Sequence, residues 1–403
     1  MTDGIREVVD VVAVRRDLHA HPELGYEEHR TTELIQNRLL ALGLEPKVLP
    51  TGTGAMCDIG SDGPLIALRA DIDALPIADE KDVPYRSTVQ GVCHGCGHDA
   101  HTAILLAAAE KLARTDLPGR VRLLFQPAEE TVPGGAYSVI TSGILDGVEE
   151  IYALHCDPRL RSGQIGTRVG PITAASDHLE VVLRGTGGHT ARPHLTQDIV
   201  FALGQVITEL PGLLSRLVDP RAAMSLVWGS VEAGRAANAI PAVGRLRGTL
   251  RVFDRQAWDQ AGPLVRKLVD QIVAASGAEA TTTYTRGVPP VVNAQSAVAV
   301  QREAILAALG EDGLAGTAQS MGGEDFAWYL DSIPGALARL GVSRPGQRAF
   351  DLHQGTFDID ETALGVGVRY TVTLARLALE RRAAQRSSEF TRPANGTDGP
   401  AAR

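Results

Sequence analysis

The stretch LIALRADID, residues 65–73, decides the fold class, because an apolar strand-like run ends directly in two aspartates. Two later runs have the same character: VRLLF (121–125) ends before the polar segment QPAEE, and IYAL (151–154) ends at His155. A segment with helical periodicity, residues 101–112, separates the first run from the second. Apolar strands that alternate with helices predict an α/β domain built on a mostly parallel sheet.

The middle of the chain follows another pattern. It predicts strands at 178–183, 223–231, 245–252 and 279–285, and helices at 196–217 and 256–276. The order β-α-β-β-α-β is typical of a ferredoxin-like sandwich, here inserted into the larger domain. We therefore expect a catalytic domain formed by residues 1–174 and 291–385, an inserted lid or dimerisation domain over 175–290, and a disordered tail at 386–403.

The composition excludes several classes of protein. The 403 residues carry a formal net charge of −9, which argues against binding to nucleic acid or to an anionic membrane surface. We find no signal-peptide core and no run of roughly 18 apolar residues that could span a bilayer. Four cysteines are too few for a disulfide scaffold. The expectation is a soluble, cytoplasmic protein without nucleic-acid or membrane partners.

Polar residues follow each of the three apolar runs. Asp71 and Asp73 end the first, Glu129 and Glu130 come shortly after the second, and His155 follows the third. In open α/β sheets the functional crevice lies beyond the carboxyl ends of the strands. We therefore expect these side chains to converge there, although they are far apart in sequence.

The densest group of reactive side chains is CHGCGHDAH, residues 93–101. A structural zinc knuckle would need a second Cys/His pair at regular spacing, and none follows. A redox dithiol would sit in a compact thioredoxin-like unit, without three histidines around it. A mixed set of thiolate, imidazole and carboxylate donors favours a catalytic divalent metal, with the other two readings kept as less favoured alternatives.

The string CGHDAH (96–101) resembles the signature of the amidohydrolase branch of the aminoacylase/carboxypeptidase-type dinuclear metallopeptidases. This branch includes hippurate hydrolases, N-acyl-L-amino-acid amidohydrolases and indole-acetyl-amino-acid hydrolases. Further blocks occur in the family's order: LHAHPELG (18–25), RADIDALP (69–76), FQPAEE (125–130), GGH (187–189), NAIP (238–241), GGEDF (322–326) and LH (352–353). The resemblance covers essentially residues 14–380.

The resemblance implies a site that binds two divalent metal ions, commonly Mn, Zn, Ni or Co. The matching metal ligands are Cys96, His98, Glu130, His155 and His353, with the cysteine expected to bridge the two ions. Glu129 matches the general base. Residues expected to orient the ligands are Asp71, Asp73, Asp99, His94 and His101.

The same resemblance assigns roles to the inserted domain. It implies that His189 stabilises the oxyanion and is supplied by the partner subunit of a homodimer. Asn238 and Arg251 match residues that hold the substrate's α-carboxylate, a task that suits the planar guanidinium. Gly323 matches a glycine-rich loop that lines the site.

The function implied is hydrolysis of the amide bond of N-acyl-L-amino acids, small molecules that yield a carboxylic acid and a free amino acid. A dipeptidase or an N-acetyl-diaminopimelate deacetylase with the same metal centre is one alternative. A non-catalytic metal or thiol sensor is another, and the presence of Glu129 disfavours it. Cys93 stands where this branch usually has Met, and Gln354-Gly355 replaces its usual pair after the last ligand, so we expect an altered acyl pocket.

Overall fold

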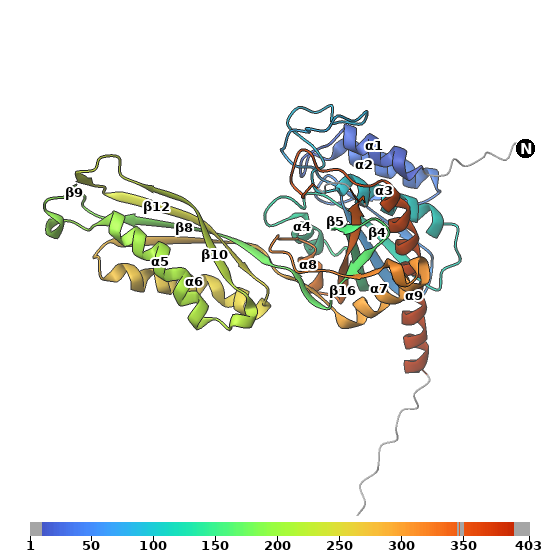
Figure 1. The fold of residues 1–403 in the computed structure, drawn as a ribbon. Coiled ribbons are helices and arrows are strands. Elements are labelled where there is room, and N and C mark those ends of the chain that lie inside the picture. The colour runs from blue at the N-terminus through green and yellow to red at the C-terminus, as the bar shows by residue number, and fades with distance from the viewer. Residues whose placement is uncertain (1–9, 345, 347–349, 391–403) are drawn as a thin grey trace, which may run out of the picture.

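The computed structural model describes residues 10–344, 346 and 350–390, which form two lobes (Figure 1). The large lobe contains an eight-stranded sheet and both ends of the described chain. The small lobe contains a four-stranded sheet with two long helices on one face. The small lobe's sheet packs on one hydrophobic core, and the large lobe's sheet has a core on each face.

The sheet of the large lobe is mostly parallel at its centre, as predicted. Its order is β1-β2-β4-β3-β5-β16-β6-β15, and the pairs β4·β3, β3·β5, β5·β16 and β6·β15 are parallel. The strands are β1 (Lys47–Val48), β2 (Ala55–Ile59), β3 (Leu65–Asp71), β4 (Arg120–Gln126), β5 (Val148–Arg161), β6 (Ile165–Thr167), β15 (Leu314–Gly316) and β16 (Gly335–Ser343). All seven residues of β3 are buried, which explains the unbroken apolar run of its first four residues, 65–68.

Helices cover both faces of this sheet. One face packs against α1 (Val11–Ala20), α2 (His29–Ala41), α3 (His98–Leu112), α7 (Gln295–Leu309) and α9 (Thr362–Phe390). The other face packs against the shorter helices α4 (Gly135–Thr141) and α8 (Ala327–Leu330). A small ribbon joins β7 (Gly170–Thr173) to β14 (Val291–Asn293), and three short 3-10 helices lie at Pro193–Leu195, Pro220–Ala222 and Glu311–Gly313.

The small lobe has the predicted ferredoxin-like topology. Its elements are β8 (Ala175–Arg184), α5 (Ile199–Leu217), β10 (Ser225–Ala233), β12 (Val243–Val252), α6 (Arg255–Ala274) and β13 (Glu279–Val288). The sheet order β10-β12-β8-β13 places the first and third strands side by side at the centre, and every neighbouring pair is antiparallel. A second ribbon, β9 (Gly188–His189) with β11 (Ala239–Ile240), lies at the end of this lobe far from the large lobe (Figure 1).

Helix α5 is long and apolar enough, by length and composition alone, to cross a membrane. This differs from the expectation that no such stretch occurs. However, one face of α5 packs into the core of the small lobe through Ile199, Ala202, Leu203, Val206, Leu210 and Leu214. An amphipathic helix that covers a sheet has this pattern, so α5 is weak support for a membrane span.

Two expectations from the sequence need correction. Strand β5 does not end at Leu154 but continues through His155 to Arg161, because His155 and Asp157 are buried polar residues within the strand. Helix α9 extends to Phe390, so residues 386–390 are helical where we expected the disordered tail to begin. The rest of that tail, residues 391–403, lies outside the described residues.

Candidate metal centre

The expected metal ligands come from four different segments of the large lobe. Cys96 precedes α3 and His98 is its first residue, while Glu130 lies in the turn after β4. His155 lies within β5, and His353 adopts a positive φ of 61° in the loop before α9. The sharp entry into α3 requires a glycine, since Gly97 has a φ of 90° and a Cβ there would lie 2.9 Å from the Cys156 sulfur.

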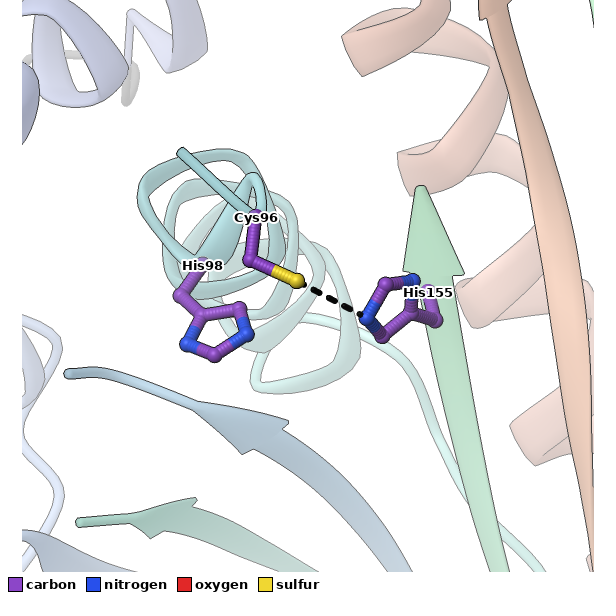
Figure 2. Close-up of side chains that lie close together, drawn as sticks. All are labelled: Cys96, His98 and His155. Atoms are coloured by element: carbon purple, nitrogen blue, oxygen red, sulfur yellow. Dashed lines mark hydrogen bonds between the residues drawn. The ribbon is translucent and has the colours of Figure 1, made fainter. Parts of the chain in front are cut away.

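The structure brings these five side chains together in two groups. Donor atoms of Cys96, His98 and His155 lie within 4.8 Å of one another, and so do those of Cys96, Glu130 and His353. Cys96 Sγ lies 3.5 Å from His155 Nε2, and Figure 2 shows the sulfur pointing toward that ring, with His98 projecting from the same segment. Glu130 Oε1 lies 3.1 Å from His353 Nε2. Both groups share Cys96.

The histidine rings are oriented as metal ligands require. His98 Nδ1 lies 2.9 Å from the Asp73 carbonyl oxygen, and His155 Nδ1 lies 2.7 Å from that of Cys156. A carbonyl can only accept, so Nδ1 is the donor in both rings, and Nε2 carries the lone pair when the ring is neutral. His98 Nε2 is buried and has no hydrogen-bond partner among the described residues. The unpartnered His98 Nε2, and the His155 Nε2 that faces Cys96 Sγ, fit a divalent metal.

Three of the predicted orienting residues contact this cluster. Asp73 Oδ2 accepts the backbone N–H of Glu130 at 2.9 Å, which holds the turn after β4. His101 Nδ1 lies 2.6 Å from Asp71 Oδ1, and its Nε2 accepts the backbone N–H of Cys156 at 2.8 Å. These contacts fix the backbone on either side of the ligands.

Asp99 and His94 act at a greater distance. Asp99 Oδ2 accepts hydrogen bonds from Arg15 Nε at 2.8 Å and lies 2.7 Å from His19 Nδ1, so it ties α3 to α1. Both ring nitrogens of His94 are buried and lack hydrogen-bond partners in the described part of the chain, and burial lowers the pKa of His94 to about 3. The His94 ring is therefore uncharged, and it lies in the loop before α3.

The centre holds an excess of negative charge. Burial, together with Glu130 and Glu129, raises the pKa of the Cys96 thiol well above its usual range. Burial, Glu324 and Glu130 likewise raise the pKa of the Glu129 carboxyl. Burial would lower the pKa of His98, but Asp71 and Asp73 outweigh it and raise that pKa to about 10. Bound cations would reverse these shifts, because they stabilise thiolate and carboxylate.

A buried ionic cluster, which the sequence did not predict, lies next to Glu129. Arg69 Nη1 lies 2.6 Å from Asp71 Oδ2, and Arg69 Nη2 lies 3.2 Å from Glu324 Oε1 and 2.8 Å from Asp325 Oδ1. Donor oxygens of Glu129, Glu324 and Asp325 lie within 4.8 Å of one another. An arginine inside an otherwise apolar strand was the available signal, since a buried arginine needs acidic partners.

The residues expected to contact the substrate lie in two separate places. Arg251 is paired with Ser176 across β12 and β8, and a Cβ at Gly323 would lie 3.0 Å from Ser176 Cβ, so these residues meet where the lobes join. His189 lies in β9 at the far end of the lobe (Figure 1), and the Asn238 carbonyl accepts the N–H of Thr190 there at 3.2 Å. The structure does not bring His189 or Asn238 to the metal ligands of their own chain.

Comparison with curated proteins yields relatives along most of the chain. An N-acetyl-L-cysteine deacetylase from Bacillus subtilis is 39% identical over 358 residues, 88% of this chain and 84% of that protein. An N-acyl-L-amino acid amidohydrolase from Geobacillus stearothermophilus is 38% identical over 288 residues, 70% and 78% of the two chains. A Rhodococcus jostii protein described as a glutamate–cysteine ligase is 51% identical over 368 residues, but this chain spans only 46% of its length.

A similar solved structure is a dinuclear metal-binding peptidase of family M20 from Bacillus subtilis. It has a TM-score of 0.80 and 36% sequence identity, and the match covers 92% of this chain and 98% of that one. The model of peptidase family M20/M25/M40 matches residues 67–377, a span that includes every ligand of the cluster. The chain is therefore a member of the M20/M25/M40 peptidase family.

Proposed function

We propose that this protein is a metal-dependent amidohydrolase that cleaves N-acyl-L-amino acids to a carboxylic acid and a free amino acid. The observation that carries the proposal is the pair of donor groups that share Cys96, with Glu129 beside them. The names of the relatives from B. subtilis and G. stearothermophilus point to the same reaction.

The five candidate ligands would hold two ions. His98 and His155 would hold one, Glu130 and His353 the other, and Cys96 would contact both. Mn, Zn, Ni and Co all accept nitrogen, oxygen and sulfur donors, so any of them suits this set. Two such ions, when bound, polarise a carbonyl and lower the pKa of a water.

Glu129 would act as the general base and then the general acid. Its Oε2 lies 3.9 Å from His98 Nε2, so the carboxylate borders the ligand cluster. Burial and neighbouring carboxylates raise the pKa of Glu129, which makes its carboxylate a stronger base toward water; the proton that it takes can then pass to the leaving amine.

The small lobe would bind the substrate's α-carboxylate through Arg251, with Gly323 lining the site. His189 would act from the partner subunit of a homodimer, which accords with the place of β9 at the end of the small lobe far from the large lobe (Figure 1). Asn238, whose carbonyl contacts Thr190 there, would help Arg251 to hold the α-carboxylate. The proposal also places the protein in the cytoplasm, without nucleic-acid or membrane partners. The net charge of −9 and four unpaired cysteines favour that setting.

Replacing Glu129 with Gln tests the base. Glu129→Gln should keep close to two metal ions per chain by elemental analysis, yet lower kcat by about 10²–10⁴-fold, the usual contribution of such a group. The exposed Glu303, on α7, provides the matched control Glu303→Gln. Unchanged turnover in Glu129→Gln would contradict the assignment, and the sensor alternative predicts no turnover even in the unaltered protein.

A substrate panel separates the amidohydrolase from its alternatives. The metal-reconstituted protein should hydrolyse one or more of the N-acetyl, N-benzoyl and indole-acetyl amino acids, with N-acetyl-L-cysteine included because a relative bears that name. Faster hydrolysis of free dipeptides or of N-acetyl-diaminopimelate would instead support the corresponding alternative.

A further inference from the structure

Arg339, on β16, is a buried cation without an anionic partner in the part of the chain that the structure describes. The residue is 6% exposed, and its Nε is buried with no hydrogen-bond partner. By contrast, the buried Arg15 and Arg69 each contact several carboxylates. A buried charge without a counter-ion destabilises the folded state, so its presence calls for another explanation.

The register of the sheet places Arg339 beside the metal ligands. Arg339 is directly paired with His155 in the parallel pair β16·β5, and paired residues project from the same face of a sheet. Leu337 and Ala153, two residues earlier on the same strands, share one core cluster and so confirm that face. Burial lowers the pKa of the His155 ring most, and the nearby positive charge of Arg339 lowers it further.

The nearest carboxylates are engaged by other groups. Glu324 Oε1 lies 3.2 Å from Arg69 Nη2 and accepts the N–H of Phe326 at 3.1 Å. Asp157 accepts two hydrogen bonds from the Arg159 guanidinium, each of 2.9 Å. Arg339 therefore lies beside the centre with its Nε donor unused among the described residues.

Building on the proposed amidohydrolase function, we propose that Arg339 binds a second carboxylate of the substrate, distinct from the α-carboxylate assigned to Arg251. A guanidinium is suited to this task, because its planar donors match both oxygens of a carboxylate. The second carboxylate has two sources: a dicarboxylic acyl group, such as succinyl, or the side chain of an acidic amino acid. Either carboxylate would supply the anionic partner that Arg339 lacks among the described residues.

The test measures kcat/KM for N-acetyl-L-methionine, N-acetyl-L-glutamate and N-succinyl-L-methionine with the metal-loaded enzyme. Arg339→Met should lower the acidic-to-neutral ratio of kcat/KM about ten- to hundredfold for one of the two acidic substrates, and that substrate identifies the source. Arg344→Met is the control, since Arg344 lies just past the end of β16 and is exposed. It should leave the ratio as it is.

Calorimetric binding to the metal-loaded Glu129→Gln protein gives a second readout that needs no turnover. The acidic ligand should bind more tightly than N-acetyl-L-methionine, and adding Arg339→Met should remove that difference, while Arg339→Lys should retain part of it. An unaltered ratio and an unaltered binding preference would overturn the proposal, as would equal losses for all three compounds. Failure of the proposed function is distinct, because it would abolish hydrolysis of every compound by the unaltered enzyme.

Discussion

At the scale of single residues, Glu28 supports the turn that carries Glu129 and Glu130. Its fully buried carboxylate accepts the backbone N–H of Ala128 and the hydroxyl of Thr53, each at 2.7 Å. Ala128 immediately precedes Glu129 and has a φ of 57°, a conformation that a non-glycine residue adopts only when its surroundings hold it. Burial raises the pKa of Glu28 from 4.5 to about 7.

This raised pKa predicts a pH-dependent effect of Glu28→Gln on the metal-free protein. Between pH 4.5 and about 7 the folded chain binds the Glu28 proton more tightly than the unfolded chain, so its contribution to stability is lost as the pH rises through this range. Glutamine stays neutral, so the variant does not lose this contribution. The free energy of unfolding of Glu28→Gln minus that of the unaltered protein should rise by about 1–3 kcal/mol between pH 4.5 and about 7. Chemical denaturation at several pH values measures it.

The exposed neighbour Glu27 supplies the control variant Glu27→Gln, which should show no such trend. A difference between Glu28→Gln and the unaltered protein that stays constant with pH would mean that Glu28 is ionised throughout. Glu28→Ala should lower stability at every pH, since it leaves the Ala128 N–H and the Thr53 hydroxyl without their partner, at about 1–3 kcal/mol for each buried group.

At the scale of elements, α8 links the small lobe to the turn after β4. The Trp328 ring contacts Tyr137 of α4 at 5.2 Å and Trp258 of α6 at 6.0 Å between centroids. Its Nε1 donates to the carbonyl oxygen of Pro133 at 2.9 Å, three residues after Glu130. Trp328 packs against the cores of both lobes, so a change in lobe orientation would act on the turn that carries the two glutamates.

Trp328→Phe keeps an aromatic ring but removes the bond to Pro133. We expect a loss of about 0.5–1.5 kcal/mol in stability, the typical worth of one hydrogen bond, together with a several-fold fall in kcat/KM. Trp228→Phe is the matched control, because no described residue accepts a hydrogen bond from Trp228 Nε1 and the residue lies in the small lobe. Equal kinetic effects of the two variants would show that α8 does not transmit lobe position to the site.

At the scale of the whole molecule, the features that depend on local sequence pattern were predictable. These are the apolar runs of β3 and β4, the ferredoxin-like order of the small lobe, and the convergence of polar residues beyond the strand ends. The set of five candidate ligands came instead from the family resemblance, and the structure brings their donor atoms together. Strand β16 was not predictable, because Arg339 interrupts its apolar run, and its role depends on pairing with a strand far away in sequence. The support of Ala128 by Glu28 was equally hidden, since it joins residues 100 apart along the chain.

The separation of His189 from its own metal ligands has a consequence for the assembled enzyme. Under the proposed homodimer, each site combines Glu129 of one chain with His189 of the other. His189→Ala and Glu129→Gln should then both be nearly inactive alone. Mixed dimers, formed by refolding equal amounts together, should recover activity, because one of their two sites keeps both residues.

Random pairing makes half of the dimers mixed, with one intact site each, so the mixture should show about a quarter of the unaltered activity per chain. A mixture of Glu129→Gln with Cys96→Ser is the matched control, because both residues belong to the same chain's centre and every site then lacks one of them. If the first mixture forms mixed dimers but stays as inactive as the second, His189 does not act from the partner chain. Recovery only in the first mixture would give the small lobe its catalytic role across the dimer.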